Sequence, residues 1–176
     1  MRELADAIRL EAFMRALGTA ATDPGRVYLT GGATAVLHGW RSTTVDADIW
    51  LVPDSDALLR AIVGLKETLR LNVELVAPGQ FLPELPGWAE RSDFIAREAK
   101  LDFLHLDYYT QILSKILRRQ SKDVKDVRSM LESGLVDPTR AWELFQDVEQ
   151  RLFRYPSIDP ATFRRAVVET LGLSER

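Results

Sequence analysis

The sequence contains no cysteine and only two histidines, His38 and His105. Without cysteine, the protein can form neither a disulfide-stabilised scaffold nor a thiolate metal site. Two histidines are also too few for a multi-histidine zinc site. Any metal ion must therefore be held by oxygen ligands, which favours Mg²⁺ or Mn²⁺.

Long apolar runs are missing as well. None approaches the roughly 20 residues that cross the hydrocarbon core of a bilayer, so we expect no membrane association. Residues 1–17 mix acids with apolar positions at helical spacing and lack the features of a secretory signal, which predicts folded, cytoplasmic protein. The net charge of −3 argues against a surface coated with nucleic-acid-binding charge but allows a local basic patch.

The hydrophobic pattern predicts an α+β protein of one domain, or a catalytic domain with a helical appendage. A first helix is expected over residues 4–17, with Leu4 and Ile8 on its buried face and Gly18 at its end. From Asp107 onward every predicted element is a helix, so we divide the chain into a core, 1–106, and a C-terminal helical region, 107–176. In the core, strands are expected at 27–30, 45–52 and 71–76, a hairpin over 94–106, and helices at 33–39 and 55–69.

Two carboxylates, Asp46 and Asp48, stand one residue apart in an otherwise apolar predicted strand. Alternate residues of a strand point to the same face, so both acids project together. Such a pair can hold a divalent cation, and Glu74 on the next predicted strand has the parity to supply a third ligand. The alternative is that the acids only solvate an edge strand and protect it from aggregation.

A glycine pair, Gly31 and Gly32, lies between the strand at 27–30 and the following helix. Glycines at a strand-to-helix turn let backbone amides approach an anion, which predicts a phosphate-binding turn. A tight turn without any ligand is the alternative. The order of strand, glycine pair, helix, acidic strand, helix and second acidic strand is more informative than either motif alone.

The residues GGATAVLHGWRSTTVDADIWL, followed by the acid in NVELV, resemble the nucleotidyltransferase superfamily, specifically its small bacterial minimal and toxin-type members (AbiEii-like, related to toxin–antitoxin systems). The resemblance covers roughly residues 27–131. It implies a nucleotidyltransferase (polymerase beta-like) fold, a mixed sheet flanked by helices. It also implies that Gly31 and Gly32 contact a nucleoside triphosphate, ATP being one candidate, and that Asp46, Asp48 and Glu74 bind magnesium. The sequence departs from the family pattern at Gly32, where serine is commoner, and at Glu74, where aspartate is usual.

Basic residues recur at helical spacing at the start of the C-terminal region. Lys115, Arg118, Arg119 and Lys122 would form one basic stripe, which could meet a triphosphate or an RNA backbone, or could simply be a solvated helix face. Related toxin-type proteins carry a lysine on this helix, so the resemblance assigns Lys115, with Arg118 beside it, to the phosphates. Nearer the acidic strand, Arg41, Ser42 and Thr43 are further candidates for nucleotide binding, although loop hydroxyls usually form turns.

The resulting prediction is an enzyme that transfers a nucleoside monophosphate from an NTP to an acceptor hydroxyl and releases pyrophosphate. Asp46, Asp48, Glu74 and Lys115 are its predicted catalytic residues. The toxin-type resemblance points to the 3′ end of tRNA or another RNA as acceptor, within a toxin–antitoxin system. Three alternatives stay open: adenylylation of a cognate toxin or antitoxin protein, a catalytically silent module that binds a nucleotide or partner, and nucleotidyl transfer to a small molecule such as an antibiotic.

Overall fold

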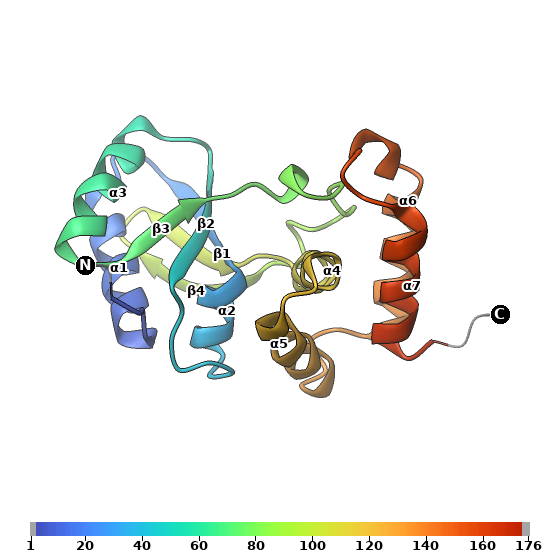
Figure 1. The fold of residues 1–176 in the computed structure, drawn as a ribbon. Helices are drawn as coiled ribbons and strands as arrows, with labels where there is room; N and C mark the ends of the chain where they lie inside the picture. The colour runs from blue at the N-terminus through green and yellow to red at the C-terminus, as the bar shows by residue number, and fades with distance from the viewer. Residues whose placement is uncertain (1–2, 174–176) are drawn as a thin grey trace. The chain divides into compact units, whose positions relative to one another are not determined.

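The computed structural model describes residues 3–173 and divides them into two compact units (Figure 1). The sheet unit comprises residues 3–77 and 92–106, and the helical unit comprises residues 78–91 and 107–173. The segment 78–91, which we expected within the core, is thus grouped with the C-terminal helices.

The sheet unit contains five strands in the order β3-β2-β1-β5-β4. Strand β1 pairs antiparallel with β2 and parallel with β5, while β2–β3 pairs are parallel and β4–β5 pairs antiparallel. This mixed sheet, together with the helices, confirms the predicted α+β class and is consistent with a nucleotidyltransferase fold. The predicted hairpin is β4–β5, and Ala99 in its turn has a positive φ of 52°. The strands are β1 Gly25–Thr30, β2 Asp46–Val52, β3 Asn72–Leu75, β4 Asp93–Glu98 and β5 Leu101–His105.

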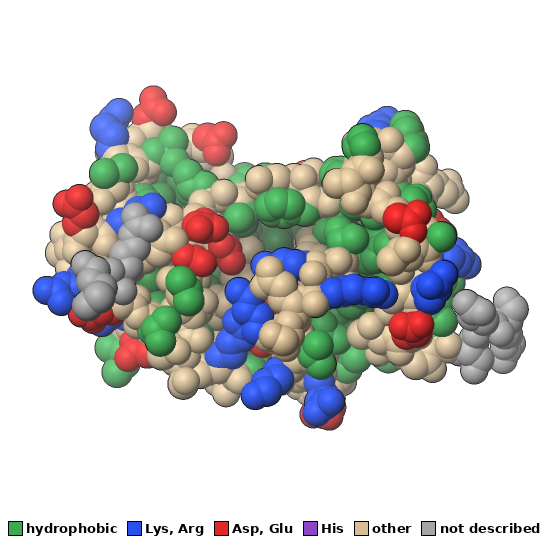
Figure 2. Space-filling view, in the orientation of Figure 1, with side chains coloured by type: hydrophobic (Ala, Val, Ile, Leu, Met, Phe, Trp, Pro, Cys, Tyr) green, Lys and Arg blue, Asp and Glu red, His purple; other side chains and the backbone are tan. Residues whose placement is uncertain are grey.

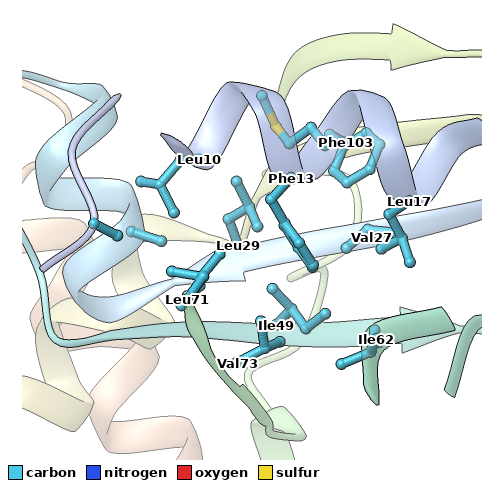
Figure 3. Packing of buried hydrophobic residues seen from close by; sticks show 14 of the residues in the cluster. Leu10, Phe13, Leu17, Val27, Leu29, Ile49, Ile62, Leu71, Val73 and Phe103 are labelled. Carbon is cyan, nitrogen blue, oxygen red and sulfur yellow. The ribbon is translucent and has the colours of Figure 1, made fainter. Parts of the chain in front are cut away.

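Helices α1 (Ala7–Ala20) and α3 (Asp56–Thr68) cover one face of this sheet, and the short α2 (Gly31–Leu37) follows β1 directly. Side chains of Asp6 and Ser55 accept hydrogen bonds from the first turns of α1 and α3, as expected of N-cap residues. Figure 3 shows the apolar stripe of α1 resting on alternate residues of the central strands. The core residues labelled there are Leu10, Phe13, Leu17, Val27, Leu29, Ile49, Ile62, Leu71, Val73 and Phe103.

Three details of the first helix were predicted wrongly. Leu4 and Ile8 are 57% and 74% exposed, so neither belongs to the buried face. Gly18 does not end the helix, which continues to Ala20. A Cβ on Gly18 would lie 2.5 Å from the carbonyl oxygen of Glu98, so the glycine lets α1 approach β4 closely.

The helical unit contains α4 (Tyr108–Arg118), α5 (Ser121–Glu132), α6 (Pro138–Glu149) and α7 (Pro160–Leu171). Asp137 and Asp159 cap α6 and α7, each directly before a proline at the first helical position. Phe145 and Phe163 pack edge to face with centroids 5.1 Å apart and join these two helices. Among residues 3–173, no helix is long and apolar enough to cross a membrane.

The segment 78–91 includes a short 3-10 helix, Pro78–Gln80. Three side chains attach it to the helices of the same unit. Arg91 binds both carboxylate oxygens of Asp107, the N-cap of α4, at 3.0 and 2.8 Å. The Tyr155 hydroxyl donates to the Gly79 carbonyl at 2.7 Å, and Arg151 donates to the Glu84 carbonyl at 2.9 Å. A second 3-10 helix, Leu152–Arg154, follows α6.

Candidate nucleotidyl-transfer site

The two predicted acids of β2 lie on the sheet face opposite the α1–α3 core. Asp48 stands opposite Thr30 of β1 and beside Glu74 of β3, and Asp46 stands beside Asn72. Both aspartates are half-buried, whereas Glu74 is exposed. Acidic side chains accordingly gather over β2 and β3 in Figure 2. The strand register therefore brings the three predicted acids to one face, as their spacing indicated.

Asn72 is a member of this group that the sequence reasoning did not single out. Its side-chain amide donates hydrogen bonds to Asp46 Oδ1 and, at 3.4 Å, to Glu74 Oε1. The side chain is only 9% exposed, so its position is well defined by packing. Asn72 is two residues from Glu74, so strand alternation places both on the acidic face. This spacing was the sequence signal that Asn72 could orient a carboxylate.

Both glycines of the turn contact the acidic strand and the loop that leads into it. Gly31 has a φ of +61°, and a Cβ on it would lie 2.7 Å from Asp48 Oδ2. A Cβ on Gly32 would lie 2.0 Å from the hydroxyl oxygen of Thr44, which itself donates to the Asp46 carbonyl at 3.0 Å. A side chain at Gly31 would displace the Asp48 carboxylate, and one at Gly32 would displace Thr44. Whether the same turn binds phosphate stays a prediction.

A family model described as a nucleotidyltransferase of unknown function (DUF6036) matches residues 6–159. The chain belongs to this family. The match includes the whole sheet, the glycine turn and both aspartates of β2. No curated protein and no solved structure matches the chain. The membership confirms the nucleotidyltransferase superfamily that the glycine turn and acidic strand resembled.

The chemistry of the two β2 carboxylates suits magnesium. Asp46 and Asp48 present hard oxygen atoms from adjacent positions on one face, and magnesium commonly takes one or two protein carboxylates together with water and substrate phosphates. Within residues 3–173, no group of three or more acidic, histidine or cysteine side chains is arranged to hold a metal ion. The pair of aspartates thus fits such an ion, while a ligand role for Glu74 stays a prediction.

Lys115 and Arg118 belong to the helical unit and are engaged in ion pairs there. The Lys115 ammonium is 4% exposed, and it lies 2.6 Å from Asp126 Oδ2 and 3.6 Å from Asp123 Oδ1. Arg118 binds both oxygens of Asp123, at 2.9 and 2.7 Å. Arg118 and Lys115 together hold the pKa of Asp123 below its usual value against the opposing effect of burial.

The predicted basic stripe does not exist as one helix face. Helix α4 ends at Arg118, Arg119 takes a left-handed conformation with φ of 53°, and Lys122 lies in the next helix. Lys115 also faces inward rather than to solvent. Charge periodicity missed the helix break because arginine is an uncommon residue at a left-handed helix end.

The other predicted nucleotide-binding residues, Arg41, Ser42 and Thr43, lie in the loop between α2 and β2. Arg41 and Thr43 are half-buried and Ser42 is exposed. The Arg41 backbone N–H donates to the Ala35 carbonyl at 3.3 Å, which holds the loop against the end of α2. These residues are in the same unit as the aspartates and precede them directly in the chain.

His38 and His105 stack with ring centroids 4.5 Å apart, and His38 also stacks on Trp40 at 4.6 Å. The Thr34 hydroxyl donates to the Leu29 carbonyl and lies 3.1 Å from Nδ1 of His105. Burial, with a smaller effect from His38, lowers the pKa of His105 to about 3. His105 is therefore a neutral, packed side chain near pH 7.

Proposed function

We propose that this protein transfers a nucleoside monophosphate from an NTP to an acceptor hydroxyl and releases pyrophosphate. The observation that carries the proposal is the contact between the glycine turn and the acidic strand. Asp48 lies against Gly31, and Asp46 projects from the same face of β2. A triphosphate at the turn would thus meet two carboxylates whose position is set by the sheet.

The transfer makes one bond and breaks one. The acceptor oxygen attacks the α-phosphorus, the bond from that phosphorus to the bridging oxygen of the β-phosphate breaks, and pyrophosphate leaves. The hydroxyl proton passes to a base, for which we propose Glu74, aligned with Asp48 and exposed to an incoming acceptor. Phosphoryl transfer of this kind depends mainly on positioning and on charge neutralisation.

We assign Asp46 and Asp48 as the residues that hold Mg²⁺ or Mn²⁺. Such an ion, when bound, neutralises charge that develops on the phosphate oxygens. The chain itself orients the ligands: Asn72 donates to Asp46, and the glycine turn supports Asp48. These contacts limit the rotation of both carboxylates, which favours a defined geometry over a flexible acidic surface.

For the acceptor we propose the 3′-hydroxyl of an RNA, with tRNA as the first candidate and a toxin–antitoxin system as the setting. This part of the proposal depends on the resemblance of the glycine turn and acidic strand to toxin-type nucleotidyltransferases. A hydroxyl on a partner protein is the competing acceptor. The two give different labelled products from the same NTP.

The test incubates the protein with each α-labelled NTP, a divalent metal, and either a tRNA pool or the candidate partner protein. We expect label in RNA and release of pyrophosphate with the wild type, and loss of at least about a hundredfold in rate for Asp48→Ala, in line with loss of a transition-state contact. Asp54→Ala is the matched control, because Asp54 is an exposed acid just beyond the same strand. Transfer by Asp48→Ala at the wild-type rate would refute the mechanism, and label in the protein alone would replace RNA as acceptor.

A further inference from the structure

A basic cavity lies at the other end of the strands that carry the predicted site. Its volume is about 500 Å³, and it lies beside the start of β1, the end of β2 and the β4–β5 turn. Arg26 lies four positions along β1 from Thr30, the neighbour of Asp48, which corresponds to about 13 Å along the strand. The lining residues are Pro24, Gly25, Arg26, Val52, Arg97, Ala99, Lys100 and Asp102.

Three of the lining side chains are cations and one is an anion. Arg26, Asp102 and Arg97 form a row across three neighbouring strands, because the register aligns Arg26 with Asp102 and Asp102 with Arg97. Lys100 extends the row at the hairpin turn. The cavity therefore carries two positive charges in excess, although the whole chain is negative at −3. A local field of this sign attracts anions.

Each cation has a different polar neighbour. Arg97 donates from Nε and Nη2 to the two oxygens of Asp102, at 2.6 and 2.9 Å. The Lys100 ammonium donates to the Thr22 carbonyl at 2.5 Å, and the neighbouring Tyr28 side chain raises the pKa of Arg26. All three cations are exposed, so an anion can reach them from solvent.

We propose that this cavity is a phosphate-binding site, separate from the Asp46–Asp48 pair. Arginine forks and an ammonium group are the donors that recognise phosphate oxygens, and Arg26, Arg97 and Lys100 supply them around one open space. The phosphate belongs either to a polynucleotide backbone or to a small phosphate-bearing molecule. Both sources present the same tetrahedral oxygens, so the experiment measures each of them.

The test compares wild-type protein with Arg26→Gln/Lys100→Gln, which leaves the Arg97–Asp102 pair intact. The probes are a short fluorescent single-stranded RNA, followed by anisotropy over a range of salt, and inorganic phosphate, followed by calorimetry. We expect about tenfold weaker RNA binding and a salt slope lower by about two, one for each lost phosphate contact. Weaker RNA binding with unchanged phosphate binding identifies a backbone site, and weaker phosphate binding identifies a site for the free anion.

The matched control is Arg60→Gln/Lys66→Gln, which removes two cations from α3 in the same unit. It changes the net charge equally and leaves the cavity intact, so RNA and phosphate affinities should stay within about twofold of wild type. Equal weakening by the control, or no weakening by a cavity variant that melts at the wild-type temperature, would overturn the proposal. Lys100→Gln alone, at an exposed turn, serves as a second variant if the double substitution does not fold. Neither probe requires nucleotidyl transfer, so the result is independent of the proposed reaction.

Discussion

Asp48 lies so close to Gly31 that a Cβ on the glycine would stand 2.7 Å from the carboxylate oxygen Oδ2. This contact joins the turn after β1 to the acidic strand β2. Glycine suits this position for two reasons. A Cβ would approach Asp48 too closely, and the backbone has a φ of +61°. The turn and the acid are therefore structurally coupled, and a substitution in either should change the position of the other.

Gly31→Ala should abolish activity far beyond its effect on stability. We expect a loss of about 1–2 kcal/mol in the free energy of unfolding from the left-handed backbone, and a much larger loss of NMP transfer because Asp48 must move. Gly39→Ala is the control: its φ is +76°, and nothing lies within 4 Å of its Cβ position. Similar loss of stability in both, but loss of transfer only in Gly31→Ala, is the expected outcome of urea unfolding and transfer assays. Equal activity in the two variants would contradict it.

Asn72→Ala should weaken the predicted site without unfolding the sheet. The variant lacks the amide that donates to Asp46 and Glu74, so the carboxylates lose a defined orientation. We expect about ten- to a hundredfold lower Mn²⁺ affinity or transfer rate, the usual effect of removing a partner that orients a metal ligand. Leu75→Ala, at a 51% exposed position of the same strand, should change neither quantity. Wild-type Mn²⁺ affinity and rate in Asn72→Ala would show that the amide has no positioning role.

Removing Asp126 should destabilise the helical unit. Lys115 is 4% exposed and its closest carboxylate is Asp126, so Asp126→Ala leaves a buried charge poorly compensated. We expect a loss of about 3 kcal/mol in unfolding free energy, and recovery of most of it in Lys115→Met/Asp126→Leu, which removes both charges of that pair and leaves Asp123 paired with Arg118. Urea denaturation provides the measurement. A Lys115→Met variant with wild-type stability and no NMP transfer would instead support the phosphate-binding role predicted for this lysine.

His105 should make the protein less stable in mild acid. Its pKa is lowered to about 3 in the folded state, against 6.5 as the ordinary value, so the unfolded chain binds a proton that the folded chain does not. Stability is therefore complete above about pH 6.5 and falls as pH decreases toward 3, by about 2 kcal/mol at pH 5. Comparing urea unfolding at pH 5 and 8 for wild type and His105→Gln isolates this contribution. An identical pH dependence in the two proteins would contradict it.

Two glycine-to-alanine changes inside helices should have opposite signs. Gly64 lies in α3 with nothing within 4 Å of its Cβ position, so Gly64→Ala should stabilise by up to about 1 kcal/mol through helix propensity. Gly18→Ala should destabilise, because its Cβ would lie 2.5 Å from the Glu98 carbonyl oxygen. Thermal unfolding of both variants tests the pair. Stabilisation by Gly18→Ala would mean that α1 and β4 can separate at little cost.

The elements near the predicted site could be read from the sequence because their signals are local. Alternation in β2 placed Asp46 and Asp48 on one face, and the same rule aligned Glu74 with them once β3 paired with β2. The helix predicted at 55–69 corresponds to α3, which begins directly after its N-cap Ser55. Such patterns depend on a few neighbouring residues, so they can be recognised without knowledge of the fold.

Other features depend on residues far apart in the chain. The spacing of Lys115, Arg118, Arg119 and Lys122 indicated one basic stripe, but Lys115 is buried against acids of the following helix. Gly18 resembled a helix end because its contact, the Glu98 carbonyl, lies 80 residues later. Asn72 acquired a candidate role only when β3 was placed beside β2.

The sequence by itself determined the α+β class, the paired acids and the glycine turn, because side-chain periodicity and backbone preference are properties of short segments. Only the tertiary structure decided why both glycines are needed, which side chain orients Asp46, and where the cations gather. The reason is physical: close contacts such as Gly31 with Asp48, or Arg26 with Asp102, arise from strand register, which many distant residues set together.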